Sequence, residues 1–351
     1  MHDSNVEGAT GPRPTDPRRL VFVRKKWSGS TGWSDAIDLF YRGAAARFAN
    51  ATRVEISVKS AGARRLARRH LIEASNPGQD PRNLVVLINH SICWWALFPT
   101  LLVLKRRGAT ICLCMHEHEH ILGLGFVWRH LASFHFKEIL RYSRLYHYVP
   151  ACLSSNLVVL TEAQASVLGI ADAIRSSYLP VDGQLFAADI PPQRSSTGKL
   201  RVLFAHDPLR FDKGHRFLAP ARSLAKSTTD VAYGRSVDVP FDQVYKKYWH
   251  CDVLFLPSDW ESFSLVLVEA LACNKFIVTN NRVGAVRLLL AKYSTDQLAT
   301  FGLFVSNHAA PAYARSLDAT ADRLAQGDSP RTRALFDEFA FDSVHFPVEL
   351  I

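Results

Sequence analysis

The chain has 351 residues, of which 48% are apolar and 21% are charged, and this ordinary globular composition excludes a disordered, collagen-like or disulfide-scaffold protein. At about 150 residues per domain, the length predicts two domains or one large domain. The formal net charge of +10 lies in one half, because residues 1–180 carry 23 Lys or Arg against 13 Asp or Glu, whereas residues 181–351 carry 19 of each.

Residues 1–19 are rich in Gly, Pro, Asp and Thr and lack the apolar core of a secretory signal, so we predict a flexible tail. The apolar runs that follow are shorter than the roughly 20 residues that span a bilayer. The cysteines stand singly in apolar runs without the spacing of a zinc site, which predicts buried, reduced thiols in a cytoplasmic protein. They are Cys93, Cys112, Cys114, Cys152, Cys251 and Cys273.

Short apolar runs alternate with helical stretches through the first half of the chain. We expect a helix from about residue 34 to residue 48 and a basic helical stretch at 64–69. The expected strands are residues 20–24, 54–58, 84–89, 109–114 and 157–160. The continuous apolar runs at 84–89 and 109–114 are typical of parallel strands that are buried on both faces.

A polar turn at residues 193–199 (QRSSTGK) marks the expected domain boundary, and the alternation restarts after it. The expected strands are residues 200–205, 253–256, 276–279 and 301–305, and the expected helices are residues 214–226, 262–273 and 284–292. Two blocks of alternating strands and helices predict an α/β protein with two doubly wound sheets that face across a cleft. Ligands should bind at the carboxyl ends of the strands, between the two blocks.

The strongest candidate site lies in residues 251–290, where Glu261 follows a strand and Glu269 comes eight residues later in the expected helix. At 1.5 Å rise per residue, that spacing is about 12 Å, roughly the reach from the sugar to the ribose of a nucleotide diphosphate sugar. The helix start offers backbone N–H groups for a diphosphate. Its residues are Ser262, Phe263 and Ser264. From spacing alone, an ordinary amphipathic helix with a surface Glu is the alternative.

The pattern P-S-x-x-E-x-F-x-x-x-x-x-E-A-L-A at residues 257–272 resembles the Glu-x7-Glu signature of the family 4, or group 1, retaining glycosyltransferases, which have the GT-B fold. The segments VLFAHDPLRFDKG (202–214), LVVLINH (84–90) and ATICLCMHEHEH (109–120) are similar to further family segments in the same order. The resemblance covers about residues 20–345. It implies two Rossmann-like domains, and the polar turn at 193–199 separates them. They are an acceptor domain at 20–192, a nucleotide-sugar donor domain at 199–335, and a C-terminal segment, 336–351, that returns to the first domain.

The resemblance also implies a hexosyltransferase-type, retaining activity with a nucleotide diphosphate sugar as donor substrate and without any cofactor. It implies that Lys213 neutralises the leaving diphosphate, and Arg210 is a candidate for a second positive charge there. Glu269 would accept hydrogen bonds from the ribose hydroxyls, while Glu261 would orient the sugar hydroxyls or stabilise the oxocarbenium-like state. A donor phosphate oxygen would take the acceptor proton, so no protein general base is assigned.

Two further parts of the site come from the first domain in this resemblance. His116, after a buried strand, would contact the donor sugar. Gly29 and Gly32, in the loop WSGSTGW, would allow the backbone to approach the diphosphate, with a plain flexible turn as the alternative. His116, His118 and His120 alternate, which leaves a zinc site as an alternative for them, but we expect no metal.

The chain departs from the family pattern near the phosphates, since Asp207-Pro208 stands where the family usually has Gly-Arg. Arg210 either replaces that charge or is a bystander. The stretch between Lys213 and the Glu motif is also short, which predicts a reduced βα unit. A catalytically inactive, nucleotide-sugar-binding protein is therefore an alternative function. A nucleic-acid binder is a weaker one, because the aromatic residues lie in apolar runs rather than among Lys and Arg.

The basic first half of the chain, residues 1–180, is expected to bind the acceptor. The basic clusters at 64–69 and 105–107 indicate either a solvated face or a surface for anionic lipid. The aromatic and basic stretch 125–148 indicates either core helices or part of such a surface, within residues 60–150. The expected acceptor is a saccharide, a lipid-linked saccharide or a natural product. We therefore expect a peripheral membrane association on the cytoplasmic face, and no nucleic-acid partner.

Overall fold

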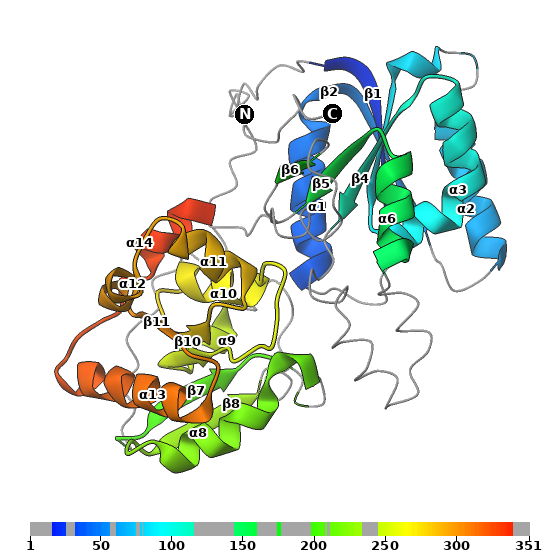
Figure 1. Ribbon diagram of the computed structural model, residues 1–351. Helices are drawn as coiled ribbons and strands as arrows, with labels where there is room; N and C mark the ends of the chain where they lie inside the picture. Colours follow the sequence, from blue (N-terminus) through cyan, green and yellow to red (C-terminus); the bar gives the residue numbers. More distant parts are fainter. Residues whose placement is uncertain are drawn as a thin grey trace, which may run out of the picture.

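The computed structural model describes residues 16–25, 32–56, 61–74, 80–115, 144–159, 174–176, 198–206, 211–233 and 245–339, together with the single residues 78 and 208. Within these ranges the chain forms two parallel sheets, one of six strands and one of five, each flanked by helices (Figure 1). The fold class expected from the sequence, an α/β protein with two doubly wound domains, is confirmed. No helix in these ranges is long and apolar enough to cross a membrane.

The first sheet has the strand order β2-β1-β3-β4-β5-β6, with every pair parallel. Its strands are β1 (Asp16–Lys25), β2 (Phe48–Ile56), β3 (Leu84–Asn89), β4 (Thr110–Met115), β5 (Asn156–Val159) and β6 (Ile174–Ser176). The helices described with it are α1 (Gly32–Ala45), α2 (Ala61–Ala74), α3 (Ser91–Arg106) and α6 (Arg144–Leu153). The apolar run of β3 is buried at all six positions, as a central strand covered on both faces requires.

Alternate residues of the central strand enter different cores. Val86 and Ile88 belong to a cluster that includes Leu71 of α2 and Leu97 of α3. On the opposite face, the cluster that contains Val85 and Leu87 includes Ile37 and Phe40 of α1. The helices therefore cover both faces of the sheet, and only the strand ends open towards loops.

The second sheet has the order β11-β10-β9-β7-β8, again with every pair parallel. Its strands are β7 (Leu200–Phe204), β8 (Thr229–Tyr233), β9 (Val253–Phe255), β10 (Phe276–Asn280) and β11 (Leu303–Ser306). Its helices are α8 (Leu218–Leu224), α9 (Lys246–Trp249), α10 (Leu265–Ala272), α11 (Gly284–Leu290), α12 (Thr295–Phe301), α13 (Ala310–Ala325) and α14 (Arg333–Phe336). In strand order this sheet is 2-1-3-4-5, so the direction of winding reverses between β7 and β9.

Several expected element limits were wrong. The tail was expected to reach residue 19, but β1 already begins at Asp16. The first helix was expected to reach Phe48, yet α1 ends at Ala45 and Phe48 opens β2, because it pairs with Asp16 and buries its ring in the core. The edge strand β8 and the helices α12 and α13 were not expected from the sequence. Cys152 is exposed, whereas the other cysteines are buried as expected.

Close backbone packing at Gly284 provides a test of this fold. A β carbon at this position would lie 1.8 Å from the carbonyl oxygen of Ser262, so Gly284→Ala should destabilise the protein by about 1–3 kcal/mol. The matched control is Gly62→Ala in α2, where nothing lies within 4 Å of the added carbon. Thermal unfolding should show a lower melting temperature for the first variant only; an unchanged Gly284→Ala protein would contradict this packing.

Candidate functional site

The reversal between β7 and β9 brings two loops together at the carboxyl ends of these strands. A 3₁₀ helix, Phe211–Lys213, follows β7 and carries Lys213. The loop after β9 carries Glu261, which forms an isolated parallel bridge with Val283 in the loop after β10. A reversal of winding is where open α/β sheets bind ligands. The topology therefore places two of the expected site residues at the expected edge.

Lys213 and Glu261 form a buried ion pair. The Lys213 Nζ lies 2.5 Å from Glu261 Oε1 and 3.5 Å from Asp212 Oδ2. The side chains of Lys213 and Glu261 are only 5% and 8% exposed. Burying a charge without a partner costs several kcal/mol, so each of these two groups depends on the other. The site therefore holds a cation and an anion in direct contact, and both are shielded from water.

Two more polar groups surround the same carboxylate oxygen. The Ser258 hydroxyl donates to Glu261 Oε1 at 3.4 Å. His206 Nε2 lies 3.3 Å from that oxygen but has no partner with hydrogen-bond geometry. The sequence analysis missed both residues. Their signal was their position, because each directly follows an apolar strand at the edge where ligands bind.

Backbone contacts hold three loops together, those after β7, β9 and β10. Glu261 donates its N–H to the Arg282 carbonyl at 3.1 Å, and its own carbonyl accepts from the N–H of Gly284 at 2.9 Å. On the other side, Gly214 has a φ of +70°, and a β carbon there would lie 1.9 Å from the carbonyl oxygen of Pro257. Only glycine fits this position without strain. The glycine after Lys213 is thus a steric requirement of the site.

Glu269 lies on α10, which begins at Leu265 after Ser264, whose hydroxyl accepts from the Leu267 N–H at 3.4 Å. The expected helix start at residue 262 was therefore wrong. Glu261 precedes the helix, so the helical-rise argument for a 12 Å separation does not apply to this pair. The Tyr248 hydroxyl donates to Glu269 Oε2 at 2.8 Å. Burial raises the pKa of Glu269, against the opposing effects of Tyr248 and Lys247.

The remaining expected residues divide into two groups. Ser262 and Phe263 lie in the loop beside Glu261, but the Phe263 ring packs in the core against Phe339 at 5.6 Å between ring centres, so only its backbone can serve a ligand. Gly32 is the first residue of α1. The others, His116, Arg210 and Gly29, lie outside the described residues. Within the described ranges, no group of three or more His, Cys, Asp or Glu side chains could hold a metal ion.

A known family model matches part of the second domain. Residues 234–321 match the family model described as "Glycosyl transferases group 1", and this segment contains both Glu261 and Glu269. The second domain therefore carries the group 1 glycosyltransferase signature that the sequence pattern indicated. No curated protein matches the sequence significantly.

Solved structures with the same fold are distant in sequence. HepE from Anabaena, in complex with UDP-glucose, is 13% identical, with 95% of this chain and 98% of that chain covered and a TM-score of 0.65. Sucrose-phosphate synthase from Thermosynechococcus elongatus is 14% identical, with 92% and 97% covered and a TM-score of 0.57. These likenesses show a GT-B architecture of two Rossmann-like domains.

The raised pKa of Glu269 predicts a pH-dependent cost in stability. A carboxyl group whose pKa is higher in the folded state costs nothing below its unfolded pKa, near 4.5, and destabilises as the pH rises through its folded pKa. Glu269→Gln keeps an acceptor for Tyr248 and removes the charge. Its melting temperature should exceed that of the wild type at about pH 7.5, and the gain should vanish towards pH 4.5.

The control for this measurement is Glu73→Gln on the exposed face of α2, where Glu73 pairs with Arg69 at 2.7 Å. An exposed ion pair of this kind contributes little. Glu73→Gln should therefore show no gain in melting temperature at neutral pH. A Glu269→Gln protein that is less stable than the wild type at neutral pH would mean that the buried carboxylate is better paired than its contacts indicate.

Proposed function

We propose that the protein is a nucleotide-sugar-dependent glycosyltransferase that transfers a hexosyl group with retention of configuration. The observation that carries the proposal is the buried Lys213–Glu261 pair, which lies at the winding reversal of the domain that bears the group 1 signature. Two neighbours of the same fold, HepE and a trehalose-6-phosphate structure from E. coli, are described with UDP-glucose and UDP-2-fluoro glucose, which supports a sugar nucleotide as donor.

In the proposed reaction the bond between the anomeric carbon and the diphosphate oxygen breaks, and both electrons leave with the nucleoside diphosphate. The acceptor oxygen bonds to the same face of the anomeric carbon, and its proton passes to a donor phosphate oxygen. The diphosphate gains charge as it leaves, so its main need is a fixed cation. Lys213 supplies this cation, and no cofactor or metal takes part.

Binding of the donor rearranges the partners of the buried pair. The diphosphate takes over Lys213, and the Glu261 carboxylate turns to the sugar, where it orients hydroxyls or stabilises the oxocarbenium-like state. Exchange of one anion for another keeps the buried ammonium paired throughout. Glu269 accepts hydrogen bonds from the ribose hydroxyls, while Tyr248 holds its Oε2. His116, Arg210, Gly29 and Gly32 complete the donor site in this proposal.

The acceptor side is proposed from the charge of the first domain. On α2, Arg65 and Arg69 are exposed, and so are Leu66 and Ile72, at 52% and 48%. A helix face that combines basic and apolar side chains suits an anionic lipid surface. We propose a saccharide acceptor carried on a lipid at such a surface, with peripheral attachment of the protein. A soluble saccharide or natural product is the competing acceptor.

One observation favours a second function. Asp207-Pro208 replaces the usual Gly-Arg beside the phosphates, so the chain could bind sugar nucleotides without transferring the sugar. Titration calorimetry with nucleoside diphosphates, combined with a screen of nucleotide sugars for donor hydrolysis, separates the two. Binding with hydrolysis supports the transferase, and binding without hydrolysis or transfer supports the binding protein. Failure to bind any nucleoside diphosphate would contradict both.

Size-matched variants test the roles of the charged residues. Lys213→Met should lower transfer more than about tenfold, because a charge-assisted contact to the diphosphate is lost. Glu261→Gln should mainly lower turnover, and Glu269→Gln should mainly weaken nucleotide affinity. The control is Lys292→Met, which removes an exposed lysine that pairs with Glu338. Wild-type rates in both Lys213→Met and Glu261→Gln would show that the pair is not part of the site.

Vesicle co-sedimentation tests the membrane proposal. Replacement of Arg65 and Arg69 by Gln should weaken binding to anionic vesicles at low salt, since each basic residue near the surface contributes about 1 kcal/mol. Replacement of the exposed Arg222 in the second domain is the control. Equal and negligible binding of the wild type to anionic and neutral vesicles would contradict the proposed membrane attachment and favour a soluble acceptor.

A further inference from the structure

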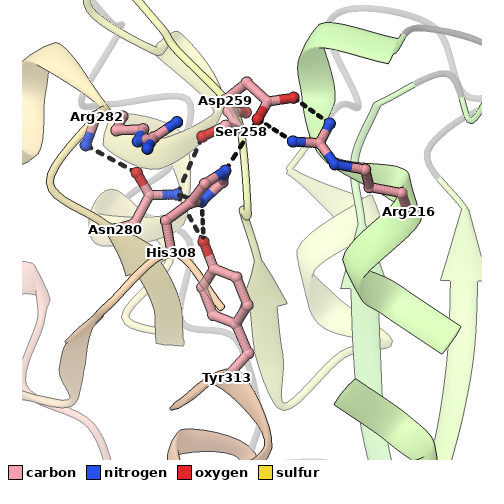
Figure 2. A network of polar contacts seen from close by, with 7 residues as sticks. All are labelled: Arg216, Ser258, Asp259, Asn280, Arg282, His308 and Tyr313. Atoms are coloured by element: carbon pink, nitrogen blue, oxygen red, sulfur yellow. Dashed lines mark hydrogen bonds and ion pairs between the residues drawn. The ribbon is translucent and has the colours of Figure 1, made fainter. Parts of the chain in front are cut away.

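A second buried carboxylate, Asp259, lies two residues before Glu261 and joins three segments of the chain (Figure 2). Its side chain is 3% exposed, and both of its oxygens accept from the guanidinium of Arg216. His308 Nε2 lies 2.9 Å from Asp259 Oδ1. Burial by itself would raise the pKa of Asp259, but His308 and Arg216 hold it below its usual value. Asp259 is therefore a fixed anion with two defined partners.

The ring of His308 is itself oriented by a chain of hydrogen bonds. Asn280 Nδ2 lies 3.0 Å from the Ser258 carbonyl and 2.7 Å from the Tyr313 hydroxyl oxygen, which accounts for its two hydrogens. The Tyr313 hydroxyl then donates its own hydrogen to His308 Nδ1 at 2.7 Å. The proton of His308 is left on Nε2, which donates it to Asp259. This assignment of protons gives each of these hydrogen bonds one donor and one acceptor, and the series ends at the Asp259 carboxylate.

This network links the carboxyl ends of four strands. Asp259 follows β9, Asn280 ends β10 and His308 follows β11, while Arg216 belongs to the segment after β7 that also carries Lys213. The main chain adds a further tie, because Asp259 donates its N–H to the Asp212 carbonyl at 2.9 Å. Asp259 therefore holds the residue before Lys213 through its backbone and a residue three positions after Lys213 through its carboxylate.

We propose that Asp259, held by Arg216 and His308, is a positioning residue that fixes Lys213 against Glu261 before a donor binds. The consequence of this positioning for donor binding rests on the proposed function, whereas the effect of Asp259 on Lys213 does not. A lysine side chain has several rotatable bonds, and fixing it in advance removes an ordering cost that ligand binding or the transition state would otherwise bear. Asp259 touches no reacting group in this proposal and acts through the segment it holds.

The competing explanation is that Asp259 and Arg216 only stabilise the domain, and the chain contains a matched pair that separates the two. Arg201 and Asp252 form a similar ion pair at the amino ends of β7 and β9, with Arg201 Nη2 2.5 Å from Asp252 Oδ1. The Arg201 N–H also donates to Asp252 Oδ2 at 2.8 Å. This pair joins the same two strands at the edge away from Lys213. Its loss should affect stability without affecting the site.

The first experiment measures the accessibility of Lys213 and needs no substrate. The full-length wild type, Asp259→Asn and Asp252→Asn are treated with an acetylating reagent well below their melting temperatures, and acetylation of Lys213 is followed by peptide mass spectrometry relative to the exposed Lys292. Asp259→Asn should raise the Lys213 rate about tenfold, since charge-assisted contacts that hold its segment are lost. Asp252→Asn should leave it unchanged. An equal increase in both, or no increase in Asp259→Asn, would overturn the proposal.

A second variant covers the case in which Asp259→Asn does not fold. Arg216 is 52% exposed on its side chain, so Arg216→Gln should fold, and it should also raise the acetylation rate of Lys213. An unchanged rate in this variant would then overturn the proposal by itself.

The second experiment measures affinity for UDP, GDP and ADP by calorimetry. For the nucleotide that the wild type binds, Asp259→Asn should weaken affinity about tenfold, and Asp252→Asn should not. Equal affinities of Asp259→Asn and wild type would overturn the link to donor binding. If the wild type binds none of the three and hydrolyses no sugar nucleotide, the proposed function fails, while the acetylation rates still decide whether Asp259 positions Lys213.

Discussion

The contact between the Lys213 ammonium and the Glu261 carboxylate is the constraint on which the rest of the second domain depends. Two charges taken out of water are tolerated only when geometry and surrounding groups compensate for their lost hydration. The partners are 48 residues apart in sequence and meet because β7 and β9 are neighbours in the sheet. The Ser258 hydroxyl, which donates to Glu261 Oε1, further compensates for the same burial.

The second sheet brings these charged residues together at its strand ends, because its faces leave little room for polar side chains. Its two faces are covered by separate apolar clusters, one lined by α10 and α11 and the other by α8 and α13. Side chains of the parallel strands are therefore committed to the core, and functional groups are displaced to the loops at the strand ends. Glu269 is the exception, because it lies inside α10, and its burial has a cost that its Tyr248 contact only partly offsets.

Much of this fold is readable from the sequence, for physical reasons that also explain the omissions. The runs at 84–89 and 276–279 are apolar at every position except Asn89 and Thr279, as strands buried on both faces must be, and both were found. The strand Thr229–Tyr233 was missed, because an edge strand that is half-exposed carries no such run. The Glu pair was found through its motif. The hydrogen bond between Asp259 and His308 spans 49 residues and two strands, and no local sequence pattern predicts a contact of this kind.

The glycine after Lys213 has a consequence for how the loops can move. Gly214 brings the backbone of the segment after β7 directly against the carbonyl of Pro257, with no side chain between them. A contact between two main chains has no rotamers with which to absorb a displacement, so it transmits motion as packed interiors do. Because the Asp259 N–H also donates to the Asp212 carbonyl at 2.9 Å, residues 211–214 and 257–259 should shift together as a single rigid piece. Any opening that admits a ligand must then come from segments that flank this piece rather than from its separation into two.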